Sequence, residues 1–295
     1  EPIIDGFLYR DTLVRTFGPP KSLKSFVTLD MAASISLGIP WQGRPTVQQQ
    51  VLYVVAEGAR GVKKRRRAWN QHHETEMKVI FFPKPVQIGD PRQMFDLISF
   101  CRLRDIGYVV FDTQARCTQG VEENDNTEMG IIVGALDILK QETGACVHLV
   151  HHSGAADAKR ARGATAFDGA VDAEFYTKRD MERSPDLVDF VSKFQKDVVE
   201  ADTVSMQAVE VAGSLILSGG APVEAGTAGQ AGEVAAALVT PGQVLYLEAI
   251  RLFGNQGATV SDVTADLADR GIKRTRTAVK KAFGGLLSGG AVAQT

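Results

Sequence analysis

The sequence has few cysteines, and its charges almost cancel. Its 295 residues include only three cysteines, Cys101, Cys117 and Cys146, and no Cys-x-x-Cys pair. This spacing excludes a cysteine zinc site and a disulfide scaffold, and it indicates a reducing compartment. The formal net charge of −2 excludes a basic field over the whole protein, so any contact with nucleic acid must come from a local patch.

Long apolar runs are also missing. No stretch reaches the length of a bilayer span, and the first residues, Glu1 to Gly6, lack the charged and apolar regions of a signal peptide. We therefore expect a soluble, cytoplasmic protein without a membrane partner.

The first half of the chain alternates apolar runs with stretches of helical period. At 44% hydrophobic residues, the chain is long enough for one large domain and a small one. This alternation predicts an α/β fold in which helices cover both faces of a parallel sheet. The expected strands are 12–17, 51–56, 78–82, 108–112 and 146–151, and the expected helices are 24–36, 60–73, 91–104 and 127–142.

After residue 166 the pattern changes. Segments 170–178, 187–194 and 204–211 have the pattern of strands joined by polar turns, which predicts an antiparallel extension of the sheet and a domain over 1–212. Residues 213–240 are rich in Gly and Ala, which is typical of a linker. Residues 241–295 return to helical periodicity and predict a small C-terminal domain with helix-turn-helix or winged-helix-like topology, or a generic three-helix cap.

The first strand leads into a short loop that ends in Lys24-Ser25 and opens a helix. This order is typical of a phosphate-binding P-loop, in which backbone N–H groups surround phosphate oxygens, a Lys reaches the β and γ phosphates, and a hydroxyl holds Mg²⁺. Gly18, Lys24 and Ser25 match G-x-x-x-x-G-K-[ST], but Leu23 replaces the second Gly. A strand-turn-helix corner with a lone Lys is the alternative. The candidate phosphate-binding residues are Gly18, Pro19, Pro20, Lys21, Ser22, Leu23, Lys24, Ser25 and Phe26.

Leu23 must hold the backbone turn without a glycine's tolerance for unusual dihedral angles. Lys21 adds a second cation that faces the same space.

Polar residues follow the other expected strands, and ligands of parallel α/β sheets collect at this edge. Glu57 follows the second strand, where it can polarise a water for attack on the γ phosphate or can simply precede a turn. Asp112 ends the fourth strand, as a Walker B carboxylate that orients the water shell of Mg²⁺ or as a cap. His151 and His152 end the fifth, where a neutral imidazole can sense phosphate, bind metal with Asp112, or cap the sheet.

Three groups of cations lie outside this set. Lys159, Arg160 and Arg162 follow the fifth strand in a loop of small residues, where an Arg is either solvated or acts as an arginine finger on a neighbouring subunit. Lys193 and Lys196 form a second candidate pair for that task. Residues 63–67, Lys-Lys-Arg-Arg-Arg, favour a solvated helix face over a dedicated DNA surface.

Taken in chain order, these motifs resemble the RecA-like ATPases of the hexameric-helicase (DnaB-like) kind. The resemblance is closer to the RepA-type helicases of plasmids and phages, and it covers about residues 3–212. It depends on residues 5–8 (Asp-Gly-Phe-Leu), 17–25 (Phe-Gly-Pro-Pro-Lys-Ser-Leu-Lys-Ser), 54–58 (Val-Val-Ala-Glu-Gly), 110–113 (Val-Phe-Asp-Thr), 124–130, 149–154 (Leu-Val-His-His-Ser-Gly) and 160–165 (Arg-Ala-Arg-Gly-Ala-Thr).

The resemblance implies a RecA-like P-loop NTPase core that assembles into a ring, usually of six subunits. It implies ATP at each subunit boundary, Mg²⁺, and single-stranded or forked DNA as a partner. Matched position by position, it assigns Lys24 and Ser25 to phosphate and Mg²⁺, and Asp112 to Walker B. It makes Glu57 the catalytic base, His152 the sensor and Arg162 the finger.

We therefore expect an ATP-hydrolysing motor on DNA. The expected role is that of a ring helicase in replication or recombination of a phage or plasmid, in the cytoplasm of a bacterial host. One alternative is a regulatory DNA-binding protein in which ATP controls assembly and residues 241–295 read the sequence. The other is a metal-dependent, structure-specific nuclease that uses Asp112, His151 and His152.

Overall fold

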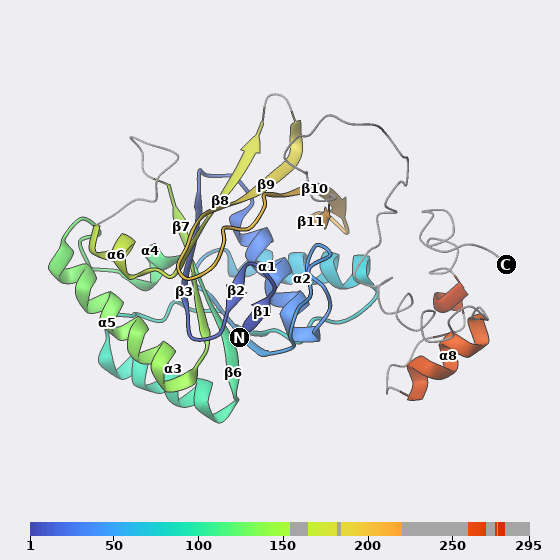
Figure 1. Ribbon diagram of the computed structural model, residues 1–295, viewed down its shortest axis with the longest axis horizontal. Helices are drawn as coiled ribbons and strands as arrows, with labels where there is room; N and C mark the ends of the chain where they lie inside the picture. Colours follow the sequence, from blue (N-terminus) through green and yellow to red (C-terminus); the bar gives the residue numbers. More distant parts are fainter. Residues whose placement is uncertain (154–164, 182–183, 220–258, 270–274, 276, 281–295) are drawn as a thin grey trace.

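The computed structural model describes residues 1–153, 165–181, 184–219, 259–269, 275 and 277–280 (Figure 1). These residues form a nine-stranded sheet, a short hairpin and the helices that cover the sheet. Of the expected C-terminal domain, helix α8 (Val260–Asp269) is described, in agreement with the helical period there. The topology of 241–295 as a whole lies outside the described residues.

The sheet has the order β11-β10-β9-β8-β3-β7-β6-β4-β5. The strands from β8 to β5 in this order are all parallel, and β9, β10 and β11 continue the sheet antiparallel. The parallel strands are β3 (Leu13–Gly18), β4 (Gln50–Val55), β5 (Ile80–Phe82), β6 (Ile106–Asp112), β7 (Cys146–His152) and β8 (Ala173–Asp180). The antiparallel strands are β9 (Ser184–Gln195), β10 (Val204–Val211) and β11 (Ser214–Gly219), and β1 (Pro2–Ile4) pairs with β2 (Leu8–Tyr9) in the separate hairpin.

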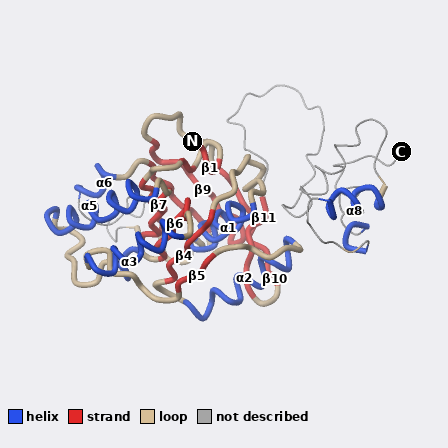
Figure 2. The backbone as a smooth tube through the Cα atoms, turned by 90° about the horizontal axis from the view of Figure 1, so that it is seen from below, coloured by secondary structure: helices blue, strands red, loops and turns tan. Residues whose placement is uncertain are grey.

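Helices cover both faces of the sheet, as the alternating pattern predicts (Figures 1 and 2). On one face lie α1 (Lys24–Leu37), α2 (Ala59–His73) and the β1–β2 hairpin, and on the other lie α3 (Pro91–Leu103), α5 (Asn126–Thr143) and the short α6 (Thr165–Ala170). Each face of the sheet has its own hydrophobic core. Neighbouring residues of β4 point to opposite faces, so Tyr53 packs into the core beneath α1 and α2, and Leu52 packs into the core beneath α3 and α5. No helix among the described residues is long and apolar enough to cross a bilayer.

The sheet confirms the antiparallel extension and differs from the sequence expectation in two details. Segment 170–178 forms β8, which pairs antiparallel to β9 as expected and also parallel to β3, because the connection through α6 provides the crossover that a parallel pair needs. The expected linker from 213 begins with β11, so the sheet extends to Gly219. Ala212 and Gly213 both have positive φ angles, 51° and 73°, and form the tight turn between β10 and β11.

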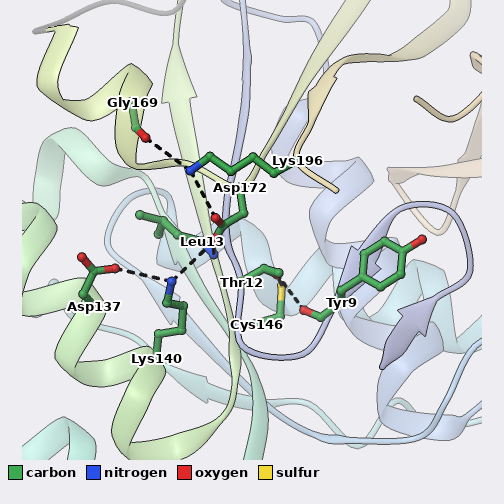
Figure 3. Close-up of polar contacts among 9 residues, drawn as sticks. All are labelled: Tyr9, Thr12, Leu13, Asp137, Lys140, Cys146, Gly169, Asp172 and Lys196. Atoms are coloured by element: carbon green, nitrogen blue, oxygen red, sulfur yellow. Dashed lines mark hydrogen bonds and ion pairs between the residues drawn. The ribbon is translucent and has the colours of Figure 1, made fainter. Parts of the chain in front are cut away.

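Asp172 fixes the start of β3 to the elements around it (Figure 3). Its carboxylate accepts a hydrogen bond from the backbone N–H of Leu13 at 2.8 Å and forms ion pairs with Lys140 at 3.5 Å and Lys196 at 3.3 Å. Lys196 also donates to the carbonyl of Gly169. Lys196, expected as an alternative finger, is therefore engaged at the end of β3 opposite to the loop that follows Gly18.

Asp30 joins α1 to two other segments of the core. Its buried carboxylate accepts hydrogen bonds from the indole N–H of Trp41 at 3.0 Å, from the amide of Gln42 at 2.8 Å and from the indole N–H of Trp69 in α2 at 2.8 Å. Burial raises the pKa of Asp30 to about 6, and the three hydrogen bonds oppose this shift. The three hydrogen bonds stabilise the charged carboxylate of Asp30, but they do not fully offset the free-energy cost of its burial.

We predict that Asp30 makes the protein less stable as the pH rises. Its pKa in the folded state lies above the unfolded value of 3.8, so the folded state binds the proton more tightly. Between pH 4 and 7, the free energy of unfolding should fall by up to about 3 kcal/mol relative to Asp30→Asn, which cannot titrate. Urea unfolding of both proteins across this range measures the difference. Parallel pH profiles would contradict the prediction.

Candidate active site

The register of the parallel strands brings the expected site residues to one edge of the sheet. Gly18 at the end of β3 pairs with His152 at the end of β7. Asp112 at the end of β6 pairs with Val55 of β4 on one side and with Val150 of β7 on the other. The carboxyl ends of four neighbouring strands therefore converge, as ligand sites in parallel α/β sheets require.

Lys24 folds back over the loop that precedes it. Its ammonium donates hydrogen bonds to the backbone carbonyl of Gly18 at 2.7 Å and to that of Pro19 at 2.9 Å. Burial lowers the pKa of Lys24 to about 8, and the nearby carboxylate of Asp112 opposes the shift. The side chain therefore remains mostly protonated at neutral pH, as a largely buried cation.

The loop lies tightly against β8. The hydroxyl of Ser22, fully buried, is 2.8 Å from that of Thr177, which itself donates to the carbonyl of Phe17 at 3.3 Å. A Cβ atom at Gly18 would meet the carbonyl oxygen of Thr177 at 2.5 Å. Only glycine fits at Gly18, and the reason is this close contact.

Leu23 adopts the left-handed conformation that the second glycine of the motif would otherwise supply. Its φ is 65°, and it is the N-cap of α1 without a hydrogen bond from its own side chain. Lys21, exposed in the same loop, is also left-handed, with a φ of 66°. The sequence keeps the shape of the turn and accepts the local cost of left-handed residues that carry a Cβ.

Asp112 is buried and held through both of its carboxylate oxygens. Ser25 donates to Oδ1 at 2.9 Å, and the phenol of Tyr53 donates to Oδ2 at 2.8 Å. Tyr53 also lies 3.0 Å from the hydroxyl of Thr28 in α1. Burial raises the pKa of Asp112, and the hydrogen bonds from Tyr53 and Ser25 oppose that shift.

Glu57 lies just beyond β4 and is half exposed. Its backbone N–H donates to the carbonyl of Asp112 at 3.1 Å, while its carboxylate accepts a hydrogen bond from Thr113 at 3.3 Å. Arg116 approaches the same carboxylate at 4.0 Å. Both contacts involve Oε2 of Glu57, so Oε1 of this half-exposed carboxylate is accessible to solvent at the edge of the sheet.

His152 is half buried near the same groups. Burial lowers its pKa, Lys24 lowers it further, and the carboxylates of Glu57, Asp112 and Glu123 oppose the shift. The ring is consequently neutral at pH 7 and can both donate and accept a hydrogen bond. The neighbouring His151 is directed into the protein, with Nδ1 2.8 Å from the carbonyl of His152.

The structure thus brings together Lys24, Ser25, Glu57, Asp112 and His152. The loop that contains Lys159, Arg160 and the expected finger Arg162 lies outside the described residues. Among the residues that are described, no three His, Cys, Asp or Glu side chains gather in the way a protein-only metal cluster requires.

A family model described as an AAA domain matches residues 1–158, which is more than half of the chain. The chain belongs to the AAA domain family. The matched residues contain the loop from Gly18 to Ser25, Glu57, Asp112 and His152, so the shared segment includes the edge of the sheet described above. No curated protein sequence matches this AAA domain.

Solved structures of low sequence identity share the fold of this AAA domain. The RadB recombinase has a TM-score of 0.51 and 12% identity, and the match covers 71% of this chain and 91% of the other. A KaiC-like protein from the hyperthermophilic archaeon Pyrococcus horikoshii OT3 has a TM-score of 0.50 and 10% identity, with 73% and 93% covered. The fold is therefore that of a RecA-like P-loop ATPase.

The residues of this AAA domain fit ATP with Mg²⁺. Gly18 lets the loop turn closely against β8, and the ammonium of Lys24 is held by backbone carbonyls, which are weaker partners than a phosphate. The hydroxyl of Ser25 and the carboxylate of Asp112 supply the hard oxygen atoms that Mg²⁺ prefers.

Sequence reasoning about this AAA domain missed three residues that position the site. Tyr53 holds Asp112, Thr177 holds the loop, and Glu123 adds negative charge beside His152. Tyr53 carried a usable signal, because it is the one Tyr among the five buried residues of β4, the others being aliphatic, and a buried hydroxyl needs a partner. Thr177 carried none, since it depends on β8 pairing with β3.

We predict that Gly at position 23 gives a more stable protein than Ala does, which is the reverse of their usual order in helices. Both Leu23→Ala and Leu23→Gly remove the partly buried side chain, but only glycine adopts a φ of 65° without steric cost. The Gly variant should be the more stable by about 1 kcal/mol.

Thermal or urea unfolding of the two variants measures this difference. Ala33→Gly, inside the same helix, is the control and should lose about 1 kcal/mol or more, because it adds backbone entropy to the unfolded chain and also removes a buried methyl group. An Ala variant at position 23 that is as stable as the Gly variant would show that the left-handed geometry is not maintained in solution.

Proposed function

We propose that this AAA domain is the ATP-hydrolysing part of a DNA-dependent motor, helicase-like, that acts in replication or recombination of a phage or plasmid. The observation that carries the proposal is the convergence of Lys24, Ser25, Glu57, Asp112 and His152 at the carboxyl edge of the sheet. The RadB recombinase, with the same fold, is by name a protein of recombination. This supports the choice of process.

In this proposal the loop from Gly18 to Phe26 surrounds the phosphates. Lys24 exchanges its two carbonyl partners for the β and γ phosphates, which are stronger acceptors because they are charged. Ser25 and Asp112 would hold Mg²⁺, which would supply positive charge to the phosphates during hydrolysis. Tyr53 keeps Asp112 in place, so the carboxylate does not have to reorient.

Glu57 acts as the general base. Its exposed carboxylate accepts the proton of a water that attacks the γ phosphate, and Thr113 fixes its orientation. His152 acts as the sensor, because a neutral imidazole beside Lys24 exchanges a hydrogen bond with phosphate when the phosphate leaves.

The proposal includes assembly into a ring, usually of six subunits, on single-stranded or forked DNA. Arg162 is proposed as the finger that completes a neighbour's site, and it lies in the segment outside the described residues. The regulatory alternative depends on residues 241–295 as a sequence reader, and the described part of that region provides no observation in its favour.

We predict that Lys24→Ala loses nucleotide binding while Lys21→Ala retains it. Loss of a charged hydrogen-bond donor to phosphate should weaken binding by about tenfold or more. Lys21 is an exposed cation in the same loop and is therefore the matched control. Titration with a fluorescent ATP analogue measures both affinities. If Lys21→Ala fails to bind and Lys24→Ala binds normally, the motif is assigned in the wrong register.

We predict that Glu57→Gln binds ATP normally but hydrolyses it about 10²-fold to 10⁴-fold more slowly, because the amide keeps the shape and removes the base. Glu76→Gln, another exposed glutamate, serves as the control. Hydrolysis is measured with and without single-stranded DNA, which should stimulate the wild-type protein.

The outcomes separate the parts of the proposal. Equal loss of binding and hydrolysis in Glu57→Gln would mean that Glu57 is structural. If DNA does not stimulate hydrolysis and forked substrates are not opened, the motor part of the proposal is wrong and the ATPase part still holds.

A further inference from the structure

Helix α2 concentrates positive charge in a chain whose net charge is −2. Its 15 residues contain six of the chain's 33 lysines and arginines, and neither Asp nor Glu. The basic residues are Arg60, Lys63, Lys64, Arg65, Arg66 and Arg67. This composition distinguishes α2 from α1, α3 and α5, each of which contains at least one acidic residue.

Four of these cations form a stripe along one face of the helix. Arg60, Lys63, Lys64 and Arg67 are exposed and follow the i, i+3, i+4, i+7 spacing of a single helix face. Within the described part of the chain, no carboxylate forms an ion pair with any of the four. Like charges at this spacing repel, so the stripe destabilises the isolated protein and would be relieved by a bound polyanion.

The opposite face of α2 is not available for a membrane. Val62, Ala68 and Trp69 are buried in the core, and the helix packs against β10 and β11 (Figure 1). A helix that lies in a bilayer surface must expose its apolar face. The cations of α2 are therefore presented by a fixed, rigid element, which favours a polyanion over a lipid surface.

The length of the stripe suits the backbone of a nucleic acid. From Arg60 to Arg67 the helix rises by about 10 Å, which equals the rise of about three nucleotides along one strand of a duplex. Lysine and arginine at such spacing contact phosphates without reading bases.

Of the six lysines and arginines of α2, Arg65 is the one that is partly buried, and it contacts the first turn of α1. The guanidinium of Arg65 lies 4.5 Å from the ring centre of Phe26, the residue after Ser25 in α1. At its other end, α2 begins two residues after Glu57, across the left-handed Gly58. Arg65 lies on the face of α2 opposite to the stripe, so α2 itself connects a polyanion on the stripe with α1, and the first turn of α2 connects it with Glu57.

We propose that Arg60, Lys63, Lys64 and Arg67 form a binding surface for the sugar-phosphate backbone of DNA, without base specificity. The inference rests on the DNA-binding part of the proposed function, and it locates that binding on α2. The exposed Arg66 flanks the stripe and adds to its charge.

The test is binding of a fluorescent single-stranded oligonucleotide, measured by anisotropy at several salt concentrations. A variant with Arg60→Gln, Lys63→Gln, Lys64→Gln and Arg67→Gln should bind at least about tenfold more weakly, and the slope of log affinity against log salt should shrink by up to about 3. The charge-matched control carries Lys84→Gln, Arg92→Gln, Arg102→Gln and Arg104→Gln, four exposed cations around α3, and should bind like the wild type.

A second measurement uses the wild-type protein, so it does not depend on the folding of a variant. Bound oligonucleotide should protect Lys63 and Lys64 from acetylation and leave Lys84 reactive. Vesicles containing phosphatidylserine provide the membrane arm. Protection by vesicles but not by oligonucleotide would overturn the proposal in favour of a lipid surface.

The inference and the proposed function can fail separately. Equal DNA binding by the α2 variant and the wild type would overturn the α2 surface alone. A wild type that binds no DNA overturns both this surface and the motor. ATP hydrolysis without DNA should be unchanged in the α2 variant, and Lys24→Ala should retain DNA binding, so a failure of hydrolysis leaves the surface intact.

Discussion

The carboxylate of Asp112 joins three elements that the rest of the site depends on. It ends β6, it accepts a hydroxyl from Ser25 in the first turn of α1, and it accepts the phenol of Tyr53 from β4. Its backbone carbonyl also receives the N–H of Glu57. The distance between the start of α1 and the sheet is thereby fixed, and the loop from Gly18 to Leu23 has to bridge that distance with whatever residues it contains. A left-handed Leu23 is a consequence of this constraint.

Much of the parallel core could be predicted from the sequence, because its strands are continuous apolar runs. β6, for example, contains only buried residues, and it differs from the predicted strand 108–112 by two residues at its start. The convergence of Glu57, Asp112 and His152 also followed from the sequence, since each residue ends or follows a strand and the strands are parallel. Predicting that these three residues meet required only the direction of the strands and no side-chain contact.

The parts that sequence reasoning missed depend on contacts between distant segments. β8 pairs parallel to β3 because the short α6 returns the chain to the same edge, and a six-residue helix leaves little periodic signal. β11 was hidden by a Gly- and Ala-rich composition, although Leu215, Ile216 and Leu217 mark a strand. Tyr53 and Thr177 act through hydroxyl groups whose partners lie 59 and 155 residues away.

The contact between β8 and the loop that follows Gly18 affects how this sequence can vary over time. The carbonyl and hydroxyl of Thr177 leave no room for a Cβ at Gly18, and the same hydroxyl is bonded to Ser22. The three positions therefore behave as one unit: a larger residue at 18 becomes acceptable only if the backbone at 177 moves, and a change at 177 removes the partner of Ser22. Compensating changes in related proteins should link the loop to a strand more than 150 residues away, outside the segment that the family model matches.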